Sequence, residues 1–116
     1  MLGYKFRGLT AVNRRKDRRI PVSIRAEISG KSALIKDISL GGLGFVTNKV
    51  KFNIGDDILV ELNVADIGSV KIGASVVRAK DTHEYGAAFL GLSSNAFRLI
   101  ETLELGQYRR RNLKVA

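Results

Sequence analysis

A two-residue alternation of apolar and polar side chains runs through the middle of this chain and stops repeatedly at turn-forming residues. In IPVSIRAEIS, from Ile20 to Ser29, every second residue is apolar. This is the period of a half-buried β-strand, whose side chains point alternately to its two faces. Short strands at regular spacing are typical of a small antiparallel barrel. Gly30-Lys31 is the expected first hairpin turn. The expected strands span residues 20–29, 32–38, 43–47, 58–64, 69–80 and 85–92.

After residue 92 the apolar period changes to that of a helix. Ser93, Ser94 or Asn95 can cap this helix. Gly106 is a candidate for its C-terminal cap, although the stretch around Gln107 can also continue the helix. Because its apolar stripe needs an apolar partner, we expect the helix to cover one opening or edge of the barrel. The expected stripe consists of Ala96, Phe97, Leu99, Ile100 and Leu103. The expected organisation is an arm over 1–19, a barrel over 20–92, the helix over 93–107 and a basic tail over 108–116.

The positive charge of the chain is concentrated at its two ends. The net charge is +9, made up of +7 in residues 1–25, −2 in residues 26–107 and +4 in residues 108–116. The densest cluster is NRRKDRR, residues 13–19, directly before the first strand. Its cations repel one another, so the cluster has no reason to fold by itself. Taken alone, it can be a solvated tail, a nucleic-acid patch or a site for one particular anion.

The sequence lacks the residues that most catalytic and metal sites require. There is no cysteine, and the only histidine, His83, stands in a polar turn, where we interpret it as a surface residue. Asp56 and Asp57 are adjacent on a strand and so point to opposite faces. We therefore expect no metal site and no enzyme. No apolar run approaches the roughly 20 residues of a membrane span, and the N-terminus lacks the features of a signal peptide. We expect a cytoplasmic protein without membrane insertion.

A second polar stretch, DISLGG, closes the second expected strand at residues 37–42. Asp37 and Ser39 are two positions apart, so their side chains can face the same side. Gly41 and Gly42 free the backbone and let a ligand approach closely. A carboxylate beside a hydroxyl can accept hydrogen bonds from a planar N–H edge such as that of guanine. The alternative is an ordinary polar β-turn closed by local side-chain bonds.

In this order, the two stretches resemble the PilZ domain family, whose members are receptors for the bacterial second messenger cyclic di-GMP. The family's first motif, RxxxR, matches the residues from Arg15 to Arg19, immediately before the first strand. A second frame, from Arg14 to Arg18, has the same spacing. We prefer the first frame, because family members usually place the last arginine directly against that strand.

The rest of the chain is similar to the family as well. The second motif, [D/N]xSxxG, is complete, and its defining residues are Asp37, Ser39 and Gly42. A strand bearing Arg78 leads to YGAAF at residues 85–89, which looks like the family's late G-x-x-F hairpin. The resemblance extends over residues 14–105. It implies an all-β fold with one helix: a six-stranded antiparallel barrel of the split-barrel type, followed by a C-terminal helix.

The resemblance also implies a ligand, cyclic di-GMP, and no cofactor. By family likeness, Arg15 and Arg19 contact phosphate and the Hoogsteen edge of guanine, with Arg14 as a third contributor; guanidinium groups can grip both bidentately. By the same likeness, Asp37 and Ser39 bind a guanine and Gly42 keeps the turn open. The weaker candidates are Arg18, Gly41 and Arg78. We expect bound phosphates to order the arm, and the domain to signal to a downstream protein that the sequence does not identify.

Two other readings remain open at this point. A nucleic-acid-binding barrel needs exposed aromatic rings on which bases can stack. Phe45, Phe89 and Phe97 fall on apolar faces of the expected elements. The rings that remain are Tyr4, Phe6, Phe52, Tyr85 and Tyr108, so nucleic acid is an unlikely partner. The other reading is a PilZ-like adaptor that acts through protein contacts only, but such members usually lack a motif that this sequence retains.

Overall fold

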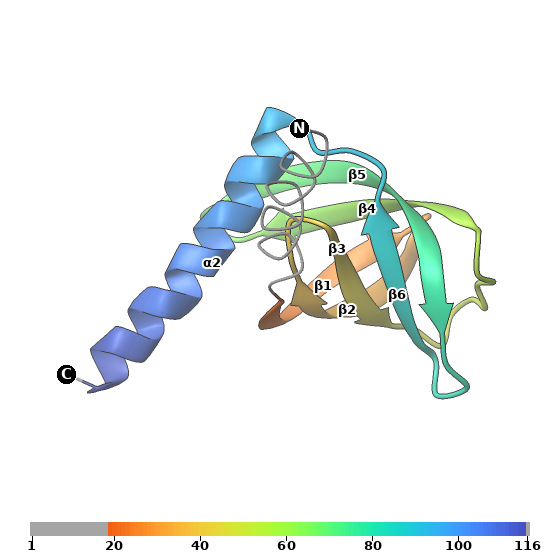
Figure 1. Cartoon of the computed structure of the whole chain (residues 1–116), viewed down its shortest axis with the longest axis horizontal. Helices are drawn as coiled ribbons and strands as arrows, with labels where there is room; N and C mark the ends of the chain where they lie inside the picture. The colour runs from red at the N-terminus through yellow and green to blue at the C-terminus, as the bar shows by residue number, and fades with distance from the viewer. Residues whose placement is uncertain (1–18, 116) are drawn as a thin grey trace, which may run out of the picture.

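The computed structural model describes residues 19–115, and the side chains of residues 19–106. Its strands close into one antiparallel barrel in the order β1-β2-β3-β6-β5-β4, with a single helix, α2, after the last strand (Figure 1). This confirms the predicted six-stranded barrel with a C-terminal helix. The elements are β1 (Ile20–Ile28), β2 (Lys31–Ile38), β3 (Gly42–Val46), β4 (Asp57–Val64), β5 (Gly68–Ala79), β6 (Glu84–Phe89) and α2 (Ser94–Val115).

Two strand ends differ from the sequence prediction. The first hairpin turns at Ser29 and Gly30 rather than at Gly30-Lys31, because both residues have positive φ, 50° and 83°. Two consecutive positive φ angles suit the right-handed twist of a hairpin. The last strand ends at Phe89 and not at residue 92. Beyond it, the Leu90 N–H donates to the Gly73 carbonyl (2.9 Å), and the chain then leaves the sheet for α2.

The side chains that fill the barrel interior come from every second residue of the strands, as the apolar alternation in the sequence predicted. Phe45, which is 1% exposed, stacks on Tyr85 with ring centroids 5.3 Å apart, and Phe52 meets both rings edge-on. The Tyr85 hydroxyl accepts the Phe52 N–H (3.4 Å). The sequence left Phe52 and Tyr85 among the rings available for stacking on bases, and the structure corrects this, because both belong to the core.

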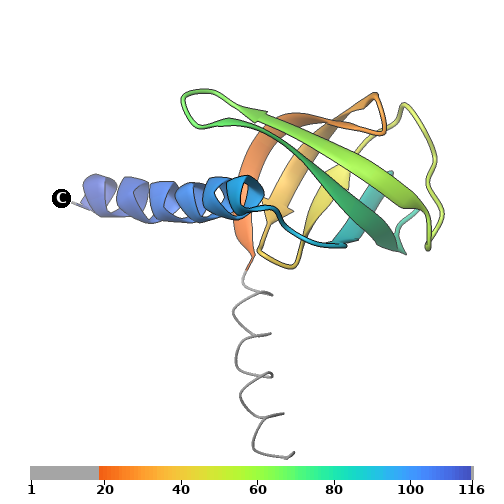
Figure 2. The same ribbon diagram turned by 90° about the horizontal axis from the view of Figure 1, so that it is seen from above.

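Helix α2 begins with a serine cap and packs only part of its length on the barrel. The Ser93 hydroxyl accepts the Ala96 N–H (3.1 Å), which satisfies one of the unpaired donors of the first turn. Ala96, Leu99 and Ile100 are buried in the barrel core. Phe97 was expected on this apolar side, but it is 41% exposed. The far part of the helix extends away from the strands (Figure 2).

The helix also continues through Gly106, where the sequence suggested a cap and then a basic tail from residue 108. Gly106 does not have the positive φ of a C-terminal cap. A glycine inside a helix costs only about 1 kcal/mol, and the good helix formers around it outweigh that cost. No helix in the described part of the chain is long and apolar enough to cross a membrane.

Candidate functional site

The last arginine of the N-terminal cluster meets the DISLGG stretch directly. Arg19 Nη1 lies 2.5 Å from Asp37 Oδ1, and the two side chains are 44% and 31% exposed. The contact follows from the β1–β2 hairpin, in which Pro21, two residues after Arg19, is the register partner of Asp37. Two motifs that are 18 residues apart in sequence therefore form one charged corner on the outside of the barrel.

Asp37 also begins a row of cross-strand neighbours on this outer face. Gly44 pairs with Asp37 on one side and with Gly86 on the other, and Gly86 pairs with Arg78. A Cβ on Gly44 would lie 2.9 Å from an Asp37 carboxylate oxygen, and a Cβ on Gly86 would lie 3.1 Å from Nη2 of Arg78. The carboxylate and the guanidinium thus lie over two adjacent glycines. This row offers a hydrogen-bond acceptor and a planar donor above a flat backbone floor.

Two irregularities in strand register put the charged ends of this row in place. The β2–β3 register shifts between Ile35 and Asp37, and the β5–β6 register shifts between Val76 and Arg78. A β-bulge of this kind re-aims the side chain beside it. Arg78 was a weaker candidate from the sequence, whereas Gly44 and the role of Gly86 were missed. The available signal was the GLG spacing after DISLG, which removes side chains from alternate positions of one strand.

Ser39 is used inside the turn between β2 and β3. It is 3% exposed, and its hydroxyl oxygen lies 3.2 Å from both the Gly41 N–H and the Gly42 N–H, which donate to it. The Ser39 N–H in turn donates to the Gly42 carbonyl (2.8 Å). These are the local bonds of a serine turn. The Ser39 side chain therefore does not share the exposed side of Asp37, as the two-residue spacing had suggested.

Gly42 is required by strand pairing. A Cβ at this position would lie 2.1 Å from the carbonyl oxygen of Ala87 on β6, an impossible contact with backbone. Next to it, the Gly41 carbonyl accepts the Phe89 N–H (2.9 Å). The glycine pair of the second motif thus lets the turn and β3 lie flush against β6, which holds the turn beside Asp37.

Replacing Ser39 with alanine is expected to lower the free energy of unfolding by about 1–2 kcal/mol, because one buried and one partly buried N–H group lose their acceptor. Urea denaturation followed by circular dichroism measures this change. Ser23→Ala, which alters an exposed serine of β1, is the control and should leave the midpoint nearly unchanged. Equal midpoints for the two variants would contradict the turn assignment.

Three predicted site residues remain, together with two residues at which no site was expected. Arg14, Arg15 and Arg18 lie outside the described residues. His83 is exposed, and Asp56 accepts the Asn53 N–H (2.8 Å). Within the part of the chain that the structure describes, no group of three or more His, Cys, Asp or Glu residues is arranged to hold a metal ion.

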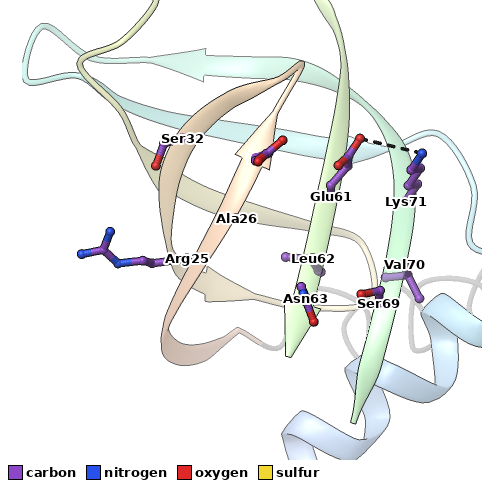
Figure 3. A pocket seen from close by; sticks show the side chains of 10 residues that line it. Arg25, Ala26, Ser32, Glu61, Leu62, Asn63, Ser69, Val70 and Lys71 are labelled. Atoms are coloured by element: carbon purple, nitrogen blue, oxygen red, sulfur yellow. Dashed lines mark ion pairs between the residues drawn. The ribbon is translucent and has the colours of Figure 1, made fainter. Parts of the chain in front are cut away.

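A cavity of about 540 Å³ lies away from this corner, over β1, β4 and β5 (Figure 3). Its charged lining includes Arg25, Glu27, Glu61 and Lys71, and Glu61 lies 4.0 Å from Lys71. Figure 3 shows the Arg25 side chain pointing away from that pair. The cavity has charges of both signs and shares no lining residue with the Asp37 row, so it does not extend the candidate site.

Comparisons with known proteins find one matching family model and several solved structures of the same fold. The family model described as PilZ domain matches residues 13–105. Among solved structures, the PilZ domain of YcgR from Escherichia coli, determined with c-di-GMP, is 17% identical at a TM-score of 0.68, covering 88% of this chain and 97% of that one. The PilZ domain of CeSA from a cellulose-synthesizing bacterium is 20% identical at a TM-score of 0.62, covering 76% and 99%.

An uncharacterized Legionella protein is 19% identical at a TM-score of 0.59, covering 81% of this chain and 98% of that one. At these identities the three structures establish a shared fold, whereas the family model also covers both motifs. No curated protein matches the sequence.

Proposed function

The chain belongs to the PilZ domain family, and on that premise we propose that it is a receptor for cyclic di-GMP. The ion pair between Arg19 and Asp37 is the observation that carries the proposal. It joins the arginine motif to the second motif on one exposed corner, so a single ligand can touch both. Members of this family are ligand-binding domains rather than known enzymes. The sequence of this chain lacks the residues that most catalytic sites require.

Each half of the corner suits one part of the ligand. Arg15 and Arg19 supply guanidinium groups for the phosphates and for guanine O6 and N7, with Arg14 as a third contributor. Asp37 supplies a carboxylate that accepts the N–H edge of guanine. Ser39 and Gly42 contribute mainly through the turn, since the hydroxyl already serves two backbone N–H groups. Arg78 stands at the other end of the glycine row, where a guanidinium can stack on a purine.

The proposed response is an ordering of the arm. The cations of residues 13–19 repel one another, and bound phosphates would neutralise them and hold the arm against the barrel. An ordered arm changes the surface that a downstream protein meets, a form of signalling used by other order–disorder switches.

Calorimetric titration of the full chain with cyclic di-GMP tests the proposal. We expect saturable binding and a defined stoichiometry. Cyclic di-AMP is the matched control ligand, because adenine lacks the O6 acceptor and presents a different hydrogen-bonding edge. Equal heats for the two nucleotides would contradict guanine recognition. An absence of heat with both would favour the adaptor that acts by protein contacts alone.

The structure gives little support to a nucleic-acid-binding barrel. Phe52 and Tyr85 are 8% and 4% exposed, so they offer no stacking platform. Adding an oligonucleotide to the same titration discriminates further. Binding that falls steeply with salt and is not displaced by cyclic di-GMP would overturn the proposed function.

A further inference from the structure

The barrel end farthest from α2 carries a second positive surface. The β1–β2 hairpin, the segment between β3 and β4, and the β5–β6 hairpin all lie at this end (Figures 1 and 2). Two cavities, of about 390 and 380 Å³, lie side by side there and share His83 in their walls. We call this the far-end basic surface, defined by Arg25, Lys49, Lys51, Lys80 and His83.

The charge of this surface is not balanced locally. Of its two cavities, only the second has a carboxylate in its lining, that of Asp81. The nearby Glu84 accepts a bond from the Thr82 hydroxyl (3.0 Å). Among residues 19–106, no carboxylate lies within ion-pair distance of the three lysines of the surface. The excess is local, because residues 20–107 as a whole carry a charge of −1.

Each cavity also has an apolar wall beside its cations. The first is lined by Ala33, Leu34 and Val46, and the second by Phe52, Ile54 and Ala79. Ile54 is 67% exposed, far more than an isoleucine with a partner in the core. Tyr85, which is only 4% exposed, also lines the second cavity. The surface therefore combines cations and apolar groups in two neighbouring hollows.

We propose that the far-end basic surface binds an acidic segment of a partner protein in which carboxylates alternate with apolar side chains. The cations are spread over two cavities, which suits several carboxylates along a chain better than one compact anion. The apolar walls have no counterpart in a nucleic-acid backbone, and the two rings that line the second cavity, Phe52 and Tyr85, are buried and offer no stacking platform. This inference rests on the proposed function, since it supplies the chemistry of the downstream protein, but its test contains no cyclic di-GMP.

The test uses the ¹⁵N-labelled full chain and a short, capped peptide rich in glutamate with interspersed leucine. We expect saturable chemical-shift changes confined to the lining of the two cavities, at residue 25 and within residues 32–34, 46–54 and 79–85. A peptide with serine in place of glutamate should leave the spectrum unchanged. The double variant Lys51→Glu/Lys80→Glu should weaken binding at least about tenfold, because two attractive contacts become repulsive.

The control variant is Lys71→Glu/Arg98→Glu, which changes the net charge by the same amount at exposed positions outside the two cavities. An equal loss of peptide binding in this variant would mean that net charge alone explains the loss in the double variant, and it would overturn the proposal. So would shifts confined to the N-terminal cluster, or no saturation at low salt. Because cyclic di-GMP binding is measured separately, either proposal can fail without the other.

Discussion

Arg19→Ala is expected to abolish measurable binding of cyclic di-GMP while leaving the circular dichroism spectrum unchanged. The substitution removes a bidentate donor to phosphate or guanine and the contact that joins the arm to Asp37. Hydrogen bonds to charged groups contribute about 1.5–3 kcal/mol each, so losing two of them lowers affinity by two orders of magnitude or more. The barrel should persist, because the Arg19 side chain is 44% exposed and lies outside the core. Arg15→Ala is expected to behave alike.

Calorimetry on the variants provides the comparison. Arg98→Ala, which removes an exposed arginine on α2, is the matched control and should bind as the unaltered chain does. Arg19→Lys keeps the charge but not the planar fork, and should recover only part of the affinity. Near-unaltered affinity in both Arg15→Ala and Arg19→Ala would show that the arginine motif does not make the contacts.

Gly42→Ala is expected to cost about 3 kcal/mol or more of folding free energy, and to lower the urea midpoint by a corresponding amount. Its Cβ would lie 2.1 Å from the Ala87 carbonyl oxygen, and a backbone atom of a paired strand cannot move aside alone. The loss of folding free energy therefore arises because β3 and β6 must move apart beside the turn that follows β2. Any loss of ligand affinity should appear together with this loss of stability.

The control for this substitution is Gly91→Ala. Gly91 lies between β6 and α2, and a Cβ built there meets no atom within 4 Å. Its variant should unfold at nearly the midpoint of the unaltered chain. A stable Gly42→Ala variant that nevertheless loses cyclic di-GMP would assign Gly42 to ligand contact and not to strand pairing.

The period of the apolar residues was sufficient to predict the strands and the helix, because burial on one face imposes it directly. The contact between Arg19 and Asp37 could be expected from the family likeness, since Arg19 precedes the first strand of a predicted hairpin and Asp37 lies near the end of its second strand. The row that runs from Asp37 over Gly44 and Gly86 to Arg78 could not be expected from the sequence. It depends on register across β2, β3, β6 and β5, and that register contains two shifts which no local pattern encodes.

The errors in the prediction also have physical causes. Ser39 and Asp37 were placed on one side by strand spacing, but the turn begins at Ser39 and draws the hydroxyl inward. Tyr85 was left among the rings available for stacking on bases, but it is the register partner of Phe45 on the neighbouring strand β3, and both rings lie in the core. Gly106 was a candidate helix end because of its residue type, with continuation left open, and the residues on either side favour the continuation that the structure has.

The hairpin of β1 and β2 holds both described halves of the candidate site, Arg19 just before its first strand and Asp37 near the end of its second. Contacts between near sequence neighbours form early in folding, whereas β1 must wait for β4, far along the chain, before the barrel can close. The charged corner is therefore assembled by the pairing of two consecutive strands that a tight turn at Ser29 and Gly30 joins. The other strands contribute the two glycines and Arg78. Arg19 and Asp37 can therefore come together before the barrel closes.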